Sequence, residues 1–259
     1  MTDHAAAADL LLKNWAATTR IAELPEAMRP MSRAAGYEAA AAVAAQSGSA
    51  VAGWKIAATS EAGQKHINVD GPIIGRILKS RLLPEGASVP LGDNIMRVAE
   101  AEFAFGFVKD LPPRSQPYTQ EEALDAVGAL HLSIEVPDSR YADFTKVGAA
   151  QLIADTACAS WLVLGPEVDR PWRGLDLSAH AVKGLLNGEV KAEGSGKAVL
   201  GDPRKALAWF VNEAATYCGG VKAGQFVTTG TCIVPMAVKP GDAVTVDYGV
   251  LGTIDCRIA

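Results

Sequence analysis

The chain opens with two stretches in which apolar and small residues recur with a helical period. Residues 5–20 are rich in Ala and Leu, and a second Ala-rich stretch covers residues 32–47. The second stretch begins at Ser32, a residue type that caps helix N-termini, and stops at Gly48, a residue type that ends helices. Both patterns predict a helical N-terminal segment, which we place at residues 1–50.

After this segment the pattern changes to short runs rich in Val, Ile, Thr and Gly, which is typical of β-strands. Asn187–Gly188 lies between two apolar stretches and predicts a β-hairpin, because this dipeptide accepts the left-handed backbone of a two-residue turn. The runs that we predict to form strands are 51–59, 96–108, 129–136, 160–165, 179–193, 225–234 and 243–258.

Two further helices interrupt the β-rich part. Thr119 and Glu122 form a capping-box sequence before ALDAVGAL, and Asp202–Pro203 supplies a capping residue followed by a proline at the first helical position. The apolar stripe that follows this proline ends at a pair of glycines. No internal repeat or long linker divides the chain. We therefore predict an α+β fold with one domain overall, in which residues 1–50 pack on a core of residues 51–259.

Composition excludes several classes of protein. The chain has 259 residues, of which 49% are hydrophobic and 20% charged, so it can bury a core and is not disordered as a whole. The net charge is −5 and no basic block occurs, so we expect no nucleic-acid partner and no anionic membrane partner. No apolar run reaches the roughly 18 residues of a membrane span, and the start lacks the pattern of a signal peptide. The four cysteines form no CxxC pair, which fits reduced thiols and a cytoplasmic location.

The stretch 96–108, MRVAEAEFAFGFV, carries the first candidate chemistry. As a strand it places Glu100 and Glu102 on one face with small residues, and its phenylalanines on the other. The phenylalanine face is expected to be core. The glutamate face is either a solvated polar face or the wall of a site, and the strand alone does not decide between them.

A second strand carries a third carboxylate. In LHLSIEV, residues 130–136, His131 and Glu135 share a face, and Glu135 directly precedes a turn. If the two strands are neighbours, three carboxylates converge, and each pair about 4 Å apart would repel by ~4 kcal/mol at an effective dielectric constant near 20. Bound protons or a cation would relieve this repulsion. Oxygen ligands without a nearby cysteine favour Mg²⁺ or Mn²⁺ over Zn²⁺.

Lys55 lies inside the apolar run GWKIAATS, residues 53–60. A lysine in such a strand is either exposed at a sheet edge or held near anions. In the second case, beside a metal-bound carbonyl, it can shuttle protons if burial lowers the pKa of its ammonium group.

Taken together, these residues resemble the 2-keto-4-pentenoate hydratase / 2-oxo-3-hexenedioate decarboxylase branch of the fumarylacetoacetate hydrolase superfamily. The resemblance covers most of the chain. The motifs that carry it are GWKIAATS (53–60), VDGPIIGRI (69–77), AEAE (99–102), EVPDSR (135–140), ADTACAS (154–160), the NGE hairpin with GDP, VTTGTCIVPMAVKPGD (227–242) and VDYGVLGTIDCRI (246–258).

The resemblance implies a mixed β-roll with flanking helices that assembles into homo-oligomeric rings, alone or with a partner enzyme of the same pathway. It implies that one Mg²⁺ or Mn²⁺ ion holds a small 2-oxo acid substrate. The implied metal ligands are Glu100, Glu102 and Glu135, and Lys55 matches the acid/base lysine. The implied substrate-binding residues are Thr229, Gly230, Arg140 and Ile73, and His131 and Asp138 are expected behind the metal ligands. For Arg140 an alternative stays open, in which it ties the turn after Glu135 to that strand.

Two departures from the family pattern concern proton transfer. The branch carries an acidic residue at the position that matches Ile73, and it has Asn and Ser where this chain has Thr156 and Cys158. The ligand set is intact, so these departures affect the reaction more than the substrate class.

The sequence therefore favours a metal-dependent hydratase of 2-hydroxy-2,4-dienoates, or 2-oxo-4-enoates, as used in meta-cleavage degradation of aromatic compounds. A decarboxylase of 2-oxo-3-enedioates is the first alternative, because both reactions pass through the same dienolate. A non-catalytic, metal-binding accessory subunit of a mixed ring is the alternative from another class.

Overall fold

The computed structural model describes residues 3–259, which contain six α-helices and thirteen β-strands. The helices are α1 (His4–Ala17), α2 (Arg33–Gln46), α3 (Glu61–His66), α4 (Gln120–Asp125), α5 (Ala149–Ala154) and α6 (Pro203–Tyr217). The strands are β1 (Val51–Ala57), β2 (Ile73–Leu78), β3 (Leu82–Pro84), β4 (Ser88–Val89), β5 (Val98–Phe107), β6 (Val127–Val136), β7 (Trp161–Glu167), β8 (Ala181–Leu186), β9 (Glu189–Ser195), β10 (Phe226–Thr228), β11 (Met236–Ala237), β12 (Ala243–Asp247) and β13 (Thr253–Ile258). No helix in this described part is both long and apolar enough to cross a membrane.

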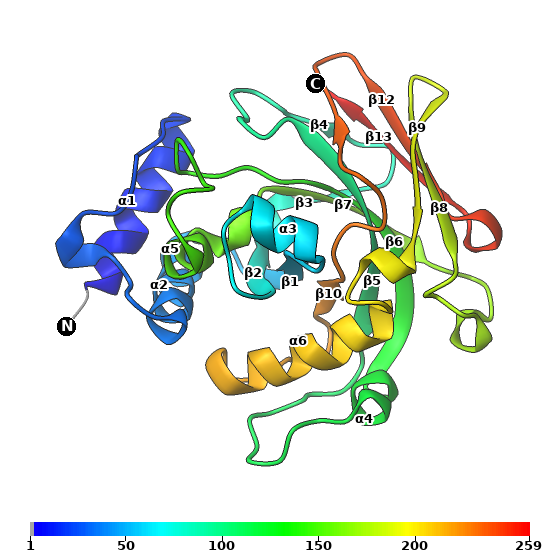
Figure 1. The fold of residues 1–259 in the computed structure, drawn as a ribbon, viewed down its shortest axis with the longest axis horizontal. Helices are drawn as coiled ribbons and strands as arrows, with labels where there is room; N and C mark the ends of the chain where they lie inside the picture. Colours follow the sequence, from blue (N-terminus) through cyan, green and yellow to red (C-terminus); the bar gives the residue numbers. More distant parts are fainter. Residues whose placement is uncertain (1–2) are drawn as a thin grey trace.

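The strands form two sheets in an α+β fold, as predicted. The larger sheet is curled and has the order β2-β1-β10-β5-β6-β7-β3, with β11 added to β5. The smaller sheet has the order β4-β13-β12-β8-β9 and lies at the upper right of Figure 1. Strand β1 pairs in parallel with β10, which in turn pairs antiparallel with β5. This order brings the N-terminal and C-terminal parts of the chain together beside β5.

The phenylalanine face of β5 is core, as predicted. Phe103 packs edge-on against Tyr248, with ring centroids 5.1 Å apart, and Phe105 packs against Trp172 at 5.9 Å. Helix α6 covers another part of the sheet through Phe210, whose ring lies 5.8 Å from that of Trp54. Both faces of β5 are buried along most of the strand, so its second face also lines the interior rather than bulk solvent.

The N-terminal helices α1 and α2 pack beside α5 at one end of the molecule (Figure 1). Their apolar residues, including Leu11 and Val43, form a cluster with Tyr141 and Ala154 of the core. The guanidinium of Arg140 lies 4.2 Å from the ring centroid of Trp15 in α1. The helical segment is thus attached to the turn that follows β6.

Local sequence signals placed the starts of three helices and the hairpin correctly. Ser32 caps α2 and the capping box of Thr119 and Glu122 starts α4. Asp202 caps α6, with Pro203 at its first position. The turn Asn187–Gly188 joins β8 to β9 with φ of 53° and 84°, the left-handed values that this hairpin requires.

One predicted strand is shorter than expected, and strands β2, β3, β4 and β11 were not predicted. The run 225–234 forms a strand only over Phe226–Thr228, because the chain turns away at Gly230, where φ is 98°. Strand β2 was not predicted, since all six of its residues are buried and its sequence shows no alternation of polar and apolar positions. The short helices α3 and α5 were also not predicted.

A left-handed turn between α5 and β7 packs directly on β2. Thr156, Ala157 and Cys158 have φ of 52°, 52° and 61°, a conformation that costs L-residues about 1–2 kcal/mol each. The carbonyl oxygen of Thr156 lies so close to Gly75 that a Cβ atom there would be 1.9 Å from it. Glycine at position 75 is therefore required by the close approach of two backbones.

We expect Gly75→Ala to lower the free energy of unfolding by ~3 kcal/mol, because the new methyl group must displace backbone atoms rather than a flexible side chain. Gly71→Ala is the matched control, since a Cβ atom at that position meets nothing within 4 Å. Urea unfolding of both variants checks this prediction. Equal stability of the two variants would show that the turn does not rest on Gly75.

Candidate metal and substrate site

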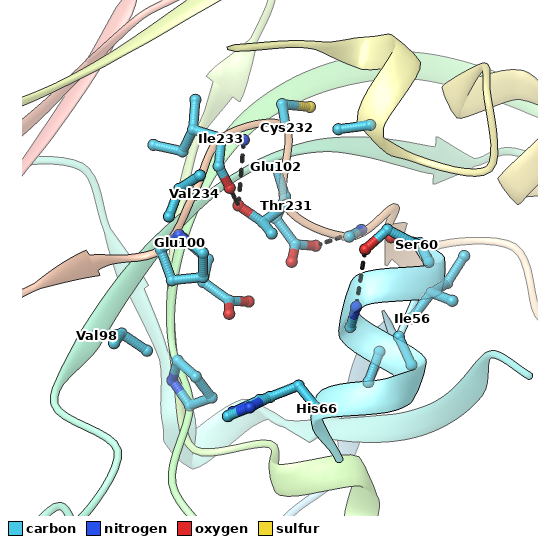
Figure 2. Close-up of a pocket in the computed structure, with 18 of the residues that line it drawn as sticks. Ile56, Ser60, His66, Val98, Glu100, Glu102, Thr231, Cys232, Ile233 and Val234 are labelled. Carbon is cyan, nitrogen blue, oxygen red and sulfur yellow. Dashed lines mark hydrogen bonds between the residues drawn. The ribbon is translucent and has the colours of Figure 1, made fainter. Parts of the chain in front are cut away.

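Three carboxylates converge on the inner face of the larger sheet. Glu100 and Glu135 are directly opposite each other in the β5–β6 ladder, and Glu102 is two residues further along β5. Each of the three offers an oxygen, and these oxygens lie within 4.8 Å of one another. Figure 2 shows Glu100 and Glu102 extending from β5 into a cavity, towards α3. The convergence expected from two adjacent strands is present.

The glutamate face is not a solvated surface. Glu102 is 1% exposed and Glu135 is 0% exposed, while Glu100 is partly exposed towards the cavity. Charged groups at such depth need partners. The interpretation of this strand as an ordinary half-exposed polar strand is therefore wrong.

Lys55 is the positive charge beside these carboxylates. It projects from β1, which lies between β2 and β10, so it is not an edge residue. Its side chain is 4% exposed, and Nζ lies 2.7 Å from Oε1 of Glu135. Burial by itself lowers the pKa of Lys55, but the negative charges of Glu135, Glu100 and Glu102 outweigh it and raise that pKa above its ordinary value. Lys55 is held as an ammonium group.

The same burial acts on the carboxylates in the opposite sense. Burial, and then the charge of Glu135, raise the pKa of Glu100 to about 7. Burial and the charges of both other carboxylates raise the pKa of Glu102 well above its ordinary value. The pKa of Glu135 is also raised by burial, against the opposing effect of Lys55. One lysine is thus insufficient to compensate three buried carboxylates.

The donor atoms left over fit a hard divalent cation. Oε2 of Glu102 accepts the backbone N–H of Gly230 at 2.8 Å. Oε1 of Glu102 and Oε2 of Glu135 are buried and have no hydrogen-bond partner in the described part of the chain. Three carboxylates and one ammonium group leave two negative charges, which a divalent cation would neutralise. Carboxylate oxygens are the ligands that Mg²⁺ and Ca²⁺ prefer.

A cavity of about 960 Å³ adjoins the carboxylates. Lys55, Glu100, Glu102 and Gly230 line it, and Ile73 contributes a fully buried side chain. Helix α3 forms the side opposite β5 in Figure 2, with Ser60 and His66 near its two ends. The volume accommodates a small organic acid.

Of the two residues expected to hold substrate oxygens, Gly230 lines the cavity and Thr229 lies behind it. Thr229 is 0% exposed, and its backbone N–H donates to the carbonyl of Phe103 at 3.0 Å. Its Oγ1 has no hydrogen-bond partner among the described residues. Gly230 contacts Glu102 through its N–H, so its direct role is to orient a carboxylate.

Arg140 and Asp138 support the turn after β6. Arg140 is 1% exposed and does not line the cavity among the described residues, so the expected contact with substrate is corrected. Its guanidinium forms an ion pair with Asp155 and donates to the carbonyl of Ala159 at 2.9 Å. Asp138 accepts from Arg20 at 2.6 Å. Both residues tie the end of the Glu135 strand to neighbouring segments, which was the alternative for Arg140.

His131 is also placed away from the carboxylates. It shares a face of β6 with Glu135, but the two are four residues apart, which is about 13 Å along a strand. Its Nδ1 lies 3.0 Å from the carbonyl oxygen of Gly165, and its ring is close to Gly106. His131 therefore does not contact the metal-ligand candidates, and its expected position is corrected.

Sequence reasoning missed several parts of the cavity. The loop after Gly230 contributes Thr231, Ile233 and Val234, which lie above Glu100 in Figure 2. Cys158 and Ala157 reach the cavity only because of the left-handed turn. The one local signal for this loop was the TTG sequence, whose glycine allows the turn towards Glu102.

Comparison with known proteins agrees with this geometry. The family model for fumarylacetoacetate (FAA) hydrolase, C-terminal, matches residues 49–259. A 2-keto-4-pentenoate hydratase of Burkholderia vietnamiensis is 33% identical over 80% of this chain and 78% of its own. A 4-oxalocrotonate decarboxylase of Pseudomonas sp. is 32% identical over 81% of this chain and 78% of its own.

The solved structure of 4-oxalocrotonate decarboxylase from Pseudomonas putida G7, complexed with magnesium and adipate, has a TM-score of 0.87 and 26% identity. The match covers 99% of this chain and 97% of that one. The curled sheet, the carboxylate cluster and the extent of these matches lead to one conclusion: the chain belongs to the fumarylacetoacetate hydrolase family.

Proposed function

We propose that this protein is a divalent-metal-dependent lyase that adds water to a 2-hydroxy-2,4-dienoate, or to a 2-oxo-4-enoate, in the degradation of aromatic compounds. The observation that supports this most directly is the convergence of three carboxylates and Lys55 at one wall of a single cavity. The similarity to 2-keto-4-pentenoate hydratase supports the choice of reaction.

In this proposal Glu100, Glu102 and Glu135 hold Mg²⁺ or Mn²⁺. A divalent cation, when bound, supplies Lewis-acid stabilisation for negative charge on the 2-oxo oxygen of a substrate. The N–H of Gly230 orients Glu102 for this task. The apolar residues of the cavity, such as Ile56 and Ile73, exclude bulk water from the reacting carbons.

Lys55 is the proposed proton carrier. Tautomerisation of a 2-hydroxy-2,4-dienoate places a proton on C5 and removes the proton of the 2-hydroxyl group, and hydration then places the hydroxyl of water on C4 and a proton on C3. The Nζ atom of Lys55 is an ammonium held beside the carboxylates. In this proposal it donates to C5 and recovers a proton from the 2-hydroxyl group, then donates to C3 and recovers a proton from the attacking water. No other ammonium group lines this cavity at comparable depth in the described part of the chain.

Decarboxylation of a 2-oxo-3-enedioate is the second candidate, favoured by the structural similarity to 4-oxalocrotonate decarboxylase over nearly the whole chain. There the bond to the departing carboxylate breaks, CO₂ leaves, and the electron pair stays in the dienolate until a proton replaces it. The purified protein distinguishes the candidates: loss of dienoate absorbance indicates the hydratase, and CO₂ release indicates the decarboxylase. Absence of both, with and without EDTA treatment and added metal, would favour a non-catalytic accessory subunit.

The homo-oligomeric ring and the partner enzyme implied by the resemblance stay predictions. We also propose that residues 1–50 and 51–259 form one domain. The apolar cluster that α1 and α2 share with Tyr141 supports this.

We expect Glu102→Gln to weaken Mg²⁺ binding at least tenfold, because one ligand charge is lost while the glutamine oxygen can still accept from Gly230. Glu193→Gln is the matched control, since Glu193 also lines the cavity but is exposed and pairs with Lys183. Isothermal calorimetry measures both affinities. Unchanged affinity in Glu102→Gln would remove Glu102 from the ligand set.

We expect the thermal stability of EDTA-treated protein to fall as the pH rises from about 5 to above 7. The pKa of Glu100 is raised from 4.5 to about 7 in the folded state. Its contribution to stability is therefore fully present below pH 4.5 and is lost as the pH rises through that raised value. Saturating Mg²⁺ should reduce this slope, and Glu100→Gln should flatten it. A melting temperature that is constant over this range in the wild-type protein would contradict the proposed charge imbalance.

We expect Lys55→Met to lower turnover by ~10²-fold or more while Mg²⁺ binding survives, because the variant keeps the apolar stem and loses the proton carrier. Lys197→Met makes the same substitution at an exposed residue of the same cavity and should keep most of the activity. Stopped-flow absorbance of the dienoate measures both rates. Near-normal turnover in Lys55→Met would leave Lys55 a structural residue.

A further inference from the structure

The side chains of one wall of the cavity, directly beyond Lys55, are hydrocarbon, and the backbone carbonyl of Thr156 packs against Gly75 beside them. In the β1–β2 ladder Lys55 is opposite Gly75, and Ala57 is opposite Ile73. The pair Ala57–Ile73 is on the same face as Lys55 and two residues further along, which is about 6–7 Å. Ala157, from the left-handed turn, adds a methyl group that would lie 3.2 Å from a Cβ atom on Gly75. A substrate chain that passes Lys55 therefore meets this wall next, in which the side chain of Ile73 is completely buried.

This wall is held in place by its backbone. The N–H of Ile74 donates to the hydroxyl of Tyr37 at 3.2 Å, and that hydroxyl donates to Glu213 at 2.7 Å. Arg33 also forms an ion pair with Glu213 and donates to the carbonyl of Pro72. The backbone is thus anchored on both sides of Ile73, at Pro72 and at Ile74, and Ile73 itself is 0% exposed. A small movement of β2 therefore cannot replace the apolar side chains of this wall with polar ones.

No free cation accompanies the wall among the described residues. The basic side chains that line the cavity are Lys55, His66 and Lys197. Lys55 is paired with Glu135, and the other two are exposed. The thiol of Cys158, beside the wall, is kept neutral because burial raises its pKa to about 12. A carboxylate placed against Ile73 would be buried without a partner, which costs several kcal/mol.

We propose that the substrate of this site has an uncharged hydrocarbon tail beyond C3, and that Ile73 is the residue that disfavours a second carboxylate there. This inference rests on the proposed function, since it takes the 2-oxo acid end of the substrate to face Glu100, Glu102 and Glu135. The inference distinguishes two kinds of substrate named for the relatives, those with one carboxylate and those with two. A pentenoate fits the wall, whereas a dicarboxylate such as an oxalocrotonate does not.

Two saturated 2-oxo acids that cannot react test the tail directly. 2-Oxohexanoate and 2-oxohexanedioate have the same chain length and differ by the distal carboxylate. We expect calorimetry in the presence of Mg²⁺ to show at least tenfold tighter binding of 2-oxohexanoate. Equal binding, or tighter binding of the dicarboxylate, would overturn the inference and leave the proposed function standing. If neither acid binds, the proposed function fails and the inference fails with it.

Variants at position 73 test whether Ile73 causes the preference for 2-oxohexanoate. Ile73→Lys should bring a cation to the wall and reduce the preference for 2-oxohexanoate at least tenfold, while Ile73→Val, which stays apolar, should keep it. Circular dichroism will show whether the Ile73→Lys variant folds. If it does not fold, the comparison of the two acids on the wild-type protein still tests the inference. Lys197→Met tests the alternative that Lys197, rather than the apolar wall, determines how the distal carboxylate binds. If the wild type binds the dicarboxylate tightly and Lys197→Met loses that binding, the exposed lysine recognises the tail and the inference is wrong.

Discussion

The burial of three carboxylates beside one lysine is the constraint on which the rest of the site depends. Glu100, Glu102 and Glu135 come from two adjacent strands, so their proximity is a direct result of strand register. Desolvation makes this arrangement costly unless charge is compensated nearby. Lys55 from β1 and the N–H of Gly230 supply part of that compensation. The remaining imbalance is what makes the cluster suited to a divalent cation.

Behind the carboxylates, buried polar residues hold neighbouring segments in position and do not line the cavity. Arg140 is almost completely buried and joins Asp155, Asp138 and Ala159, so it holds both the end of β6 and the start of the left-handed turn. The backbone energy stored in that turn is compensated by these contacts. As a result the turn can press against Gly75 and complete one wall of the cavity.

The carboxylate face of β5 was predictable from sequence because alternation in a strand assigns each residue to one side. This rule grouped Glu100 with Glu102 and separated them from the phenylalanines. The same rule failed for His131, because a face of a ten-residue strand is much longer than a site. Strand β2 and its Ile73 wall were not predicted as structure, since a strand buried on both sides has no alternation. The contact of Gly230 with Glu102 spans 128 residues of sequence, so no local pattern could reveal it.

The position of β10 between β1 and β5 has a consequence for how the molecule assembles. As the chain leaves the ribosome, β1 can pair with β2, β5 with β6, and β6 with β7, from segments that are close in sequence. Within the larger sheet, as far as the described residues show, β1 and β5 are bridged by Phe226–Thr228, near the end of the chain. Until that short strand is made, no strand pairing sets Lys55 of β1 beside the carboxylates of β5, and β5 is an open sheet edge. Contacts of such long sequence separation form late in folding. A truncated chain that lacks β10 would therefore contain every charged residue of the site but not the strand that sets β1 in register beside β5.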